Sequence, residues 1–205
     1  MPKTKTTLIF TIFLAFCVIV FGAYVRLTDA GLGCPDWPGC YGFITVPDTA
    51  EELSAIEESF PGQVVEPGKA WREMIHRYIA SLLGLLILIL FVSEVLKKNK
   101  TVFSDNFNLK ISLLLLLLVI FQGLLGMWTV TLKVHPFVVL AHLVGGLSTL
   151  SLLFIYLKRL SAPAKPRANF TGLLFFGLVL LIAQILLGGW TSTNYAALGC
   201  PDLPL

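Results

Sequence analysis

The chain has 205 residues, of which 56% are hydrophobic and 13% are charged. A soluble domain carries about a quarter charged residues, so this composition argues against a soluble globular protein. The formal net charge is only +3, with 15 Lys and Arg against 12 Asp and Glu, and it suggests no nucleic-acid partner.

Five apolar runs are long enough to cross a bilayer as helices, which takes roughly 20 residues each. They are Leu8–Val25, Tyr78–Leu96, Leu109–Val130, Phe137–Leu157 and Phe170–Thr191. Buried helices of a soluble protein would need polar faces, which these runs lack. The first run is long for a signal peptide and is not followed by a small-x-small cleavage site, so we expect it to remain as a helix. The sequence therefore predicts an all-α integral membrane protein.

Basic residues lie in alternate connections of these runs. Cations lie before the first run, between the second and third runs, and between the fourth and fifth runs. They are Lys3, Lys5, Lys97, Lys98, Lys100, Lys110, Lys158, Arg159, Lys165 and Arg167. The positive-inside rule places these segments in the cytoplasm. The long loop 26–72 is acidic and is expected in the periplasm. Since no Arg- and Ser-rich leader precedes the first run, we expect a multi-pass protein of the bacterial inner (plasma) membrane with a cytoplasmic N-terminus.

The loop 26–72 begins with a stretch rich in Gly and Pro that is expected to be irregular, and the acidic stretch 48–60 is expected to form a short surface helix. Cys34 and Cys40 lie in this loop, on the side of the membrane where bacterial disulfides form. Their spacing is not CxxC, and zinc would need more ligands than the loop offers. We therefore predict a disulfide, either structural or redox-labile. Cys17 is expected to act as a small apolar residue inside the first helix.

One segment of the sequence occurs twice. Residues 22–38, GAYVRLTDAGLGCPDWP, return as residues 188–204, GGWTSTNYAALGCPDLP, and each copy follows a long apolar run. Repeated membrane units are usually halves of one architecture. We expect residues 1–160 to form a four-helix transmembrane bundle and residues 161–205 to begin a second, repeated bundle that is incomplete in this sequence. Cys200 is the counterpart of Cys34, so its partner is expected beyond the end of this sequence.

A weaker repeat links the runs that cross in the same direction. Residues 122–131, QGLLGMWTVT, resemble residues 184–193, QILLGGWTST, and the first run ends similarly in GAYV at 22–25. Each copy places a small residue and an aromatic residue near the outer interface. One explanation is an aromatic belt with small residues for close helix packing. The other is that the small residues leave a flat slot for a planar ligand.

Two of the three histidines lie at matched depth. His76 opens the second apolar helix and His142 lies early in the fourth, roughly 9 Å inside its start at 1.5 Å per residue. Both helices run from outside to inside. Two such imidazoles can bind a haem iron from opposite sides; alternatively, each histidine only bonds a neighbouring helix. His135, in a short outer loop beside a proline, is expected to be exposed.

Charged groups surround these histidines. Glu73 lies three residues before His76 on the same helix face. It is either an interfacial acid near the positive end of its helix, or a group that accepts a proton or stabilises positive charge on a bound substrate. Arg26 and Arg77 either hold haem propionates by charge-assisted hydrogen bonds or snorkel to the interface.

Together, residues 22–40, the motif EMIHR at 73–77, His142 and residues 188–204 resemble the haem A synthase family of integral membrane proteins. The resemblance spans nearly the whole chain. It implies two four-helix bundles related by a pseudo-twofold axis, each with a histidine pair. It also implies oxidation of a ring methyl of haem O to the formyl group of haem A, for terminal oxidase assembly. One bundle would bind a haem b cofactor and the other the substrate haem O.

Carried over by position, His76 and His142 are similar to the pair that the family assigns to the substrate side. Glu73 is similar to the acid needed for turnover, and Cys34 and Cys40 to the outer-loop cysteine pair. The resemblance departs after the fifth run, because the second histidine pair is not in this sequence. The chain is then either a truncated product or a half whose two copies supply both bundles. Expected partners are haem O, membrane lipid, haem O synthase or oxidase assembly factors, and a second copy in a homo-oligomer.

The function expected from this resemblance is that of an oxidoreductase acting on haem O. Its methyl group would be hydroxylated successively to a hydrated aldehyde that loses water, while electrons leave through the cofactor haem. The rival functions are a non-catalytic bis-histidine cytochrome that relays electrons, or a haem carrier. The spacing of Glu73 and His76 favours the enzyme, whereas the missing second histidine pair favours the electron-relaying cytochrome or an inactive fragment.

Overall fold

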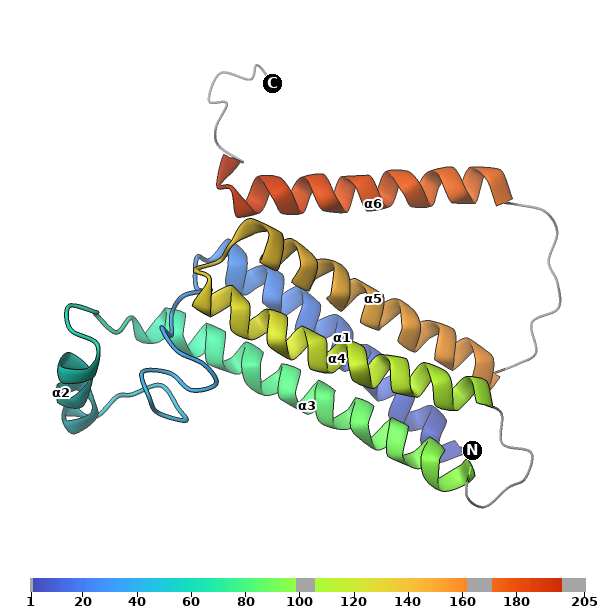
Figure 1. The fold of residues 1–205 in the computed structure, drawn as a ribbon, viewed down its shortest axis with the longest axis horizontal. Helices are drawn as coiled ribbons and strands as arrows, with labels where there is room; N and C mark the ends of the chain where they lie inside the picture. The colour runs from blue at the N-terminus through green and yellow to red at the C-terminus, as the bar shows by residue number, and fades with distance from the viewer. Residues whose placement is uncertain (1, 99–105, 162–170, 197–205) are drawn as a thin grey trace.

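The computed structural model describes residues 2–98, 106–161 and 171–196. These residues form six helices (Figure 1). Their bounds are α1 Pro2–Leu27, α2 Ala50–Ser59, α3 Pro67–Lys98, α4 Asn106–Thr131, α5 Pro136–Ser161 and α6 Thr171–Thr193. All except α2 are long and apolar enough to cross a membrane. The all-α membrane architecture predicted from the five apolar runs is confirmed.

Four of the long helices form a bundle. α1 contacts α3 and α5, and α4 contacts the same two helices, so α3 and α5 lie diagonally across the ring. Neighbouring helices run in opposite directions (Figure 1). The loop between α1 and α3, together with α2, lies at one end of the bundle, which we call the loop end; the N-terminus lies at the other, which we call the far end. α3 and α5 therefore both start at the loop end.

The larger apolar core fills the half of the bundle near the far end. It takes residues from the first half of α1 and α4 and from the second half of α3 and α5. Its buried members are Leu8, Ile12, Ala15, Leu83, Ile87, Leu90, Ile111, Leu115, Leu153 and Tyr156. A separate buried cluster holds the loop against the start of α3, and it includes Cys34, Cys40 and Met74. Between these two clusters lies the loop half of the bundle, where α3 and α5 carry their histidines.

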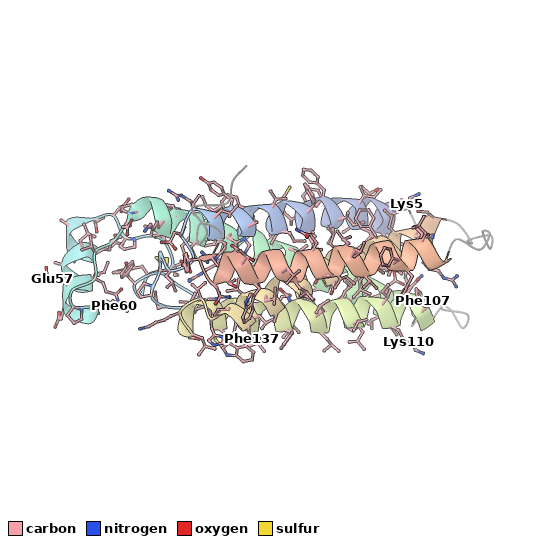
Figure 2. The ribbon with its side chains drawn as sticks, turned by 90° about the horizontal axis from the view of Figure 1, so that it is seen from above. Lys5, Glu57, Phe60, Phe107, Lys110 and Phe137 are labelled. Carbon is pink, nitrogen blue, oxygen red and sulfur yellow. A yellow bond between two sulfur atoms is a disulfide. The ribbon has the colours of Figure 1, made fainter. Side chains whose placement is uncertain are left out.

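The fifth long helix, α6, packs against α5 on the outside of the bundle (Figure 1). It lies close to α5 at Gly189, where a Cβ would stand 2.7 Å from Cδ1 of Leu140. Most of its apolar side chains are exposed. In Figure 2, Lys5 and Lys110 lie at the far end of the bundle, and Glu57 of α2 lies beyond the loop end.

Two boundaries differ from the sequence-based expectation. α3 begins at Pro67, about three turns before the apolar run at Tyr78, because its first turns are polar and an apolar window does not detect them. Proline suits the first helical position, since its missing N–H has no partner there in any helix. The loop is correspondingly shorter than the expected 26–72. His76 therefore lies about two and a half turns inside α3 and does not open it.

The short acidic helix expected within 48–60 is confirmed as α2. Its N-terminus carries a capping box: the Thr49 hydroxyl accepts from the N–H of Glu52, and the Glu52 carboxylate accepts from the N–H of Thr49. The N–H groups of Asp48 and Thr49 hold the pKa of Glu52 below its ordinary value. Since this helix is held by its own cap, it can stand at the surface of the loop.

Candidate functional site

His76 and His142 face the bundle interior from its two diagonal helices. Each imidazole has a buried Nδ1 that finds no hydrogen-bond partner, and the two rings lie within electrostatic range of each other. The backbone carbonyl of Gln122 lies beside the ring of His142. His135 is exposed in the turn between α4 and α5, as expected. The structure thus brings two of the three histidines together and leaves the third outside.

Each of these two imidazoles packs against a glycine of a neighbouring helix. A Cβ on Gly22 of α1 would stand 2.8 Å from Cε1 of His76, closer than real Cβ contacts allow. A Cβ on Gly126 of α4 would stand 3.7 Å from Cε1 of His142, which is ordinary van der Waals contact. The ring of Phe21 stacks on that of His76, with centroids 6.4 Å apart. The position of His76 therefore depends on a bare backbone beside it.

These contacts bear on the weaker sequence repeat. Its aromatic residues point away from the bundle: Tyr24 is 47% exposed, Trp128 37% and Trp190 41%. Its glycines at 22 and 126 point inward, against the two imidazoles. The two explanations of the repeat thus apply to different residues, because the aromatics have the exposure of a belt while the glycines lie where a flat slot is expected.

Glu73 is buried although it is ionisable, with only 5% of its surface exposed. One carboxylate oxygen accepts from the backbone N–H of Cys34 at 3.0 Å, and the other is ion-paired with Arg77 one turn along α3. A buried charge needs such partners, because it is very costly when unpaired. The carboxylate therefore joins the disulfide loop to the helix that carries His76.

Arg77 fastens the same loop from the other side. Its guanidinium donates to the carbonyls of Asp36 at 3.0 Å, Pro38 at 3.1 Å and Gly39. Glu73 and these three carbonyls together accept hydrogen bonds from both terminal nitrogens of Arg77. From its sequence position Arg77 is expected to meet haem propionates or the interface; the structure gives it the loop backbone as its partner.

The loop itself is cross-linked, and the predicted bond between Cys34 and Cys40 is present. Inside the cross-link, the carboxylate of Asp36 accepts from the N–H groups of Tyr41 at 2.6 Å and Gly42 at 2.7 Å. Burial, with added repulsion from nearby carboxylates, raises the pKa of Tyr41. A Cβ on Gly33 would stand 2.6 Å from a backbone carbon of α3, so the loop backbone lies directly on that helix. Cys17 is a free cysteine in α1, and Cys200 lies outside the described residues.

Arg26 joins the end of α1 to the end of α6. Its Nη2 donates to the carbonyl of Ser192 at 2.5 Å, its guanidinium lies 4.3 Å from the ring centroid of Tyr195, and the Tyr195 hydroxyl donates to Asp29 at 3.1 Å. Both hydrogen bonds join residues 166 positions apart, which is the offset of the longer sequence repeat. Equivalent positions meet in this way beside a local twofold axis. The Nε of Arg26 is buried without a partner.

One polar residue of the interior, Gln122 on α4, has no role predicted from the sequence. Its Nε2 is buried and has no hydrogen-bond partner. A Cβ on Gly145 of α5 would fall on its carboxamide. The signal in the sequence is an amide inside an apolar run, at the first position of the repeat QxLLG.

Among the described residues, no group of three or more His, Cys, Asp or Glu side chains is arranged to hold a metal ion. Structural zinc sites take four protein ligands and catalytic ones usually three, so the imidazole pair alone does not suit zinc. Two facing imidazoles suit the two axial positions of a haem iron.

Five apolar helices, four of them bundled around a pair of imidazoles, define a multi-pass, all-α membrane protein with a histidine site in its interior. The chain belongs to the COX15-CtaA family, described as cytochrome oxidase assembly protein, whose family model matches residues 5–205.

Several curated relatives carry the name heme A synthase. The protein of Shewanella oneidensis is 50% identical over 98% of this chain and 59% of its own length. Those of Halalkalibacterium halodurans and Alkalihalophilus pseudofirmus are 29% and 28% identical, each over 92% of this chain and 59% of its own length. The chain thus spans 59% of the length of these relatives. No solved structure matches it significantly.

Proposed function

We propose that this chain forms the substrate-binding part of a haem A synthase, which oxidises a methyl group of haem O to the formyl group of haem A for terminal oxidase assembly. Membership of the family and the shared name of its relatives support this function. The observation that carries it is the pair of buried, unpartnered imidazole nitrogens on diagonal helices.

His76 and His142 are our proposed iron ligands. Leaving a buried polar atom without a partner costs about 1–3 kcal/mol, so two such nitrogens in one small region are unfavourable unless a ligand engages the rings. Because α3 and α5 are diagonal, their imidazoles can approach a substrate iron from opposite sides. Gly22 and Gly126, on the two remaining helices, remove side-chain bulk beside the rings. The residues present therefore fit a bis-imidazole haem.

Glu73 is the proposed catalytic acid–base group. Oxidation of a methyl to a formyl group, with water as the source of the oxygen, releases four electrons and four protons in total, so a proton acceptor beside the substrate is useful. The Cys34 N–H and Arg77 hold the carboxylate on the face of α3 that carries His76. A fixed negative charge there would also stabilise positive charge developing on the substrate.

A haem b cofactor would supply the exit for electrons. The resemblance assigns it to the second bundle, which residues 161–205 would begin after the first bundle of residues 1–160. The histidine pair of this chain makes one site, and we assign that site to the substrate rather than to haem b.

Arg26 is our better-supported candidate for binding a haem propionate. Its buried Nε lacks an acceptor, whereas the terminal nitrogens of Arg77 already donate to Glu73 and to loop carbonyls. A carboxylate meeting that N–H would form a charge-assisted hydrogen bond. Propionates at this position would point toward the loop end of the bundle.

We place the loop end outside the bacterial inner membrane and the far end in the cytoplasm. The distribution of charge supports this orientation, since Lys5 and Lys110 lie at the far end and Glu57 of α2 lies beyond the loop end (Figure 2). Haem O synthase, oxidase assembly factors and a second copy of the chain are the proposed protein partners.

The purified chain, supplied with haem O in detergent, tests the site. We expect a low-spin bis-imidazole spectrum that His76→Ala or His142→Ala converts to high spin or abolishes, while His135→Ala leaves it unchanged. An unchanged spectrum in both the His76 and His142 variants would overturn the ligand assignment. In a protein of the relatives' full length, Glu73→Gln should retain the spectrum and stop conversion of haem O.

A further inference from the structure

Gln122 lies at the edge of the proposed haem site. α4 runs toward the loop end, so Gln122 lies one turn farther from that end than Gly126, the residue beside His142. It is two turns along α4 from the fully buried Leu115, and this spacing places both on the inward face of the helix. Its side chain therefore reaches into the bundle on the far-end side of the His142 ring.

Gly145 leaves room for this side chain. It lies three residues after His142 on α5, on the same helix face and one turn farther from the loop end. Any Cβ there would fall on the Gln122 carboxamide. By contrast, a Cβ on the adjacent Gly146 would meet only Cγ1 of Ile19, at 3.6 Å. The Gln122 amide is thus held against α5, on the far-end side of the proposed iron ligand His142.

The amide has no protein partner for its Nε2. Besides the Nε of Arg26, three buried, unpartnered side-chain nitrogens lie in this half of the described bundle, and they belong to His76, His142 and Gln122. The first two have a proposed ligand. A leucine or methionine in place of Gln122 would avoid an unsatisfied amide, so its presence indicates that a polar group of the ligand meets it.

We propose that Gln122 recognises the side-chain hydroxyl of the substrate haem and so selects haem O over protohaem. This inference rests on the proposed function. Haem O carries a hydroxyl-bearing isoprenoid side chain where protohaem carries a vinyl group, on the edge away from the propionates. With propionates toward the loop end at Arg26, that edge points toward the far end, which is the side on which Gln122 lies. A primary amide and a hydroxyl both donate and accept, so they pair in either orientation of the carboxamide.

Such a contact gives selectivity because its loss is costly. When a ligand without the hydroxyl fills the site, the buried amide is again left without a partner. Sites built to hydrogen-bond a substrate hydroxyl reject analogues that lack it much more strongly than apolar pockets reject a missing methylene. We expect the amide to favour haem O by about tenfold or more.

The test compares the two haems on the purified full chain in detergent, with each dissociation constant read from the low-spin band. Gln122→Met keeps the length of the side chain and removes the amide. Gly145→Ala keeps the amide and displaces it. Both variants should lower the preference for haem O over protohaem by about tenfold, through weaker binding of haem O, while the protohaem affinity and spectrum stay unchanged.

Two matched controls separate this effect from general disturbance. Gly146→Ala makes the same change one residue along α5, where a Cβ fits. Gln184→Met changes the counterpart of Gln122 in the repeat, whose side chain on α6 is exposed. Both should keep the preference of the unmodified protein.

Equal weakening of both haems by Gln122→Met would assign the residue to packing and overturn the inference. An unchanged preference in Gln122→Met would also overturn it, while leaving the histidine site intact. If His76→Ala and His142→Ala do not alter haem O binding, the proposed function itself fails and the inference falls with it.

Discussion

The imidazole of His76 lies against the bare backbone of Gly22, where a Cβ would stand 2.8 Å from its Cε1. On the other side of the bundle, Gly126 leaves 3.7 Å to the same atom of His142. The two glycines occupy corresponding places in the sequence repeat, yet only one of them is sterically required. This difference allows a matched comparison.

Gly22→Ala should displace His76 and weaken haem binding, whereas Gly126→Ala should leave the site nearly unchanged. Overpacking in a filled interior typically costs about 1–3 kcal/mol, and here the side chain that must move is a proposed ligand. Haem titration followed by the low-spin band measures the effect. Equal behaviour of the two alanine variants would show that the close packing at Gly22 does not hold His76.

Glu73→Ala should be more harmful than Glu73→Gln. The glutamine retains an oxygen that can accept from the N–H of Cys34, while alanine leaves that N–H and the Arg77 guanidinium without their buried partner. Breaking a buried ion pair from one side costs about 3–5 kcal/mol. Limited proteolysis of the loop should be faster in the alanine variant. If both variants are cleaved at the rate of the unmodified protein, Glu73 does not hold the loop.

Serine at Cys34 and Cys40 should loosen the loop without removing the histidine site. The bond closes a short loop, and the chain-entropy estimate of its contribution is about 2–3 kcal/mol. Hydrogen exchange of the backbone N–H groups around Cys34 should rise, including the one bonded to Glu73. The low-spin haem spectrum should persist. Loss of haem binding together with retained protection of the loop would contradict this separation of roles.

The sequence alone predicts the helices well because apolar runs of membrane length have few alternative structures. It fails at the start of α3, where Pro67 begins a helix whose first turns are polar. It also predicts that His76 and His142 share one half of the bundle, since both helices start on the same side. The disulfide follows from the two cysteines and the compartment expected for their loop.

Other features depend on packing and could not be predicted. The partners of Arg77 are loop carbonyls, which any sequence contains and no pattern distinguishes. The contact of Gly22 with His76 requires the rotation of α1 about its axis, which depends on all its neighbours. Gln122 is visible in the sequence as an amide in an apolar run, but its unpartnered nitrogen is a property of the folded bundle.

Labelling should establish the membrane orientation. Single cysteines replacing Ser54 of α2 and Lys110 of α4 lie at exposed positions at opposite ends of the bundle. In intact cells, an impermeant thiol reagent should mark the first and not the second, because acidic segments face outward and basic ones inward. After membrane disruption, both should react. Equal labelling in intact cells would reject the proposed orientation.

The junction between α1 and α6 makes the last prediction. Tyr195 and Asp29 occupy equivalent positions of the repeat, and the Tyr195 hydroxyl donates a hydrogen bond to the Asp29 carboxylate. The guanidinium of Arg26 lies over the Tyr195 ring. Tyr195→Phe removes the hydrogen bond and keeps the ring, so it should cost about 0.5–1.5 kcal/mol at the end of α6. Arg26→Met removes both the hydrogen bond to Ser192 and the contact with the Tyr195 ring, and should free the end of α6 further.

Hydrogen exchange at residues 190–195 should rise from Tyr195→Phe to Arg26→Met, while Tyr24→Phe, a matched change on α1, should leave it unchanged. If neither variant alters exchange there, the contacts of Arg26 and Asp29 do not fasten α6 to the bundle.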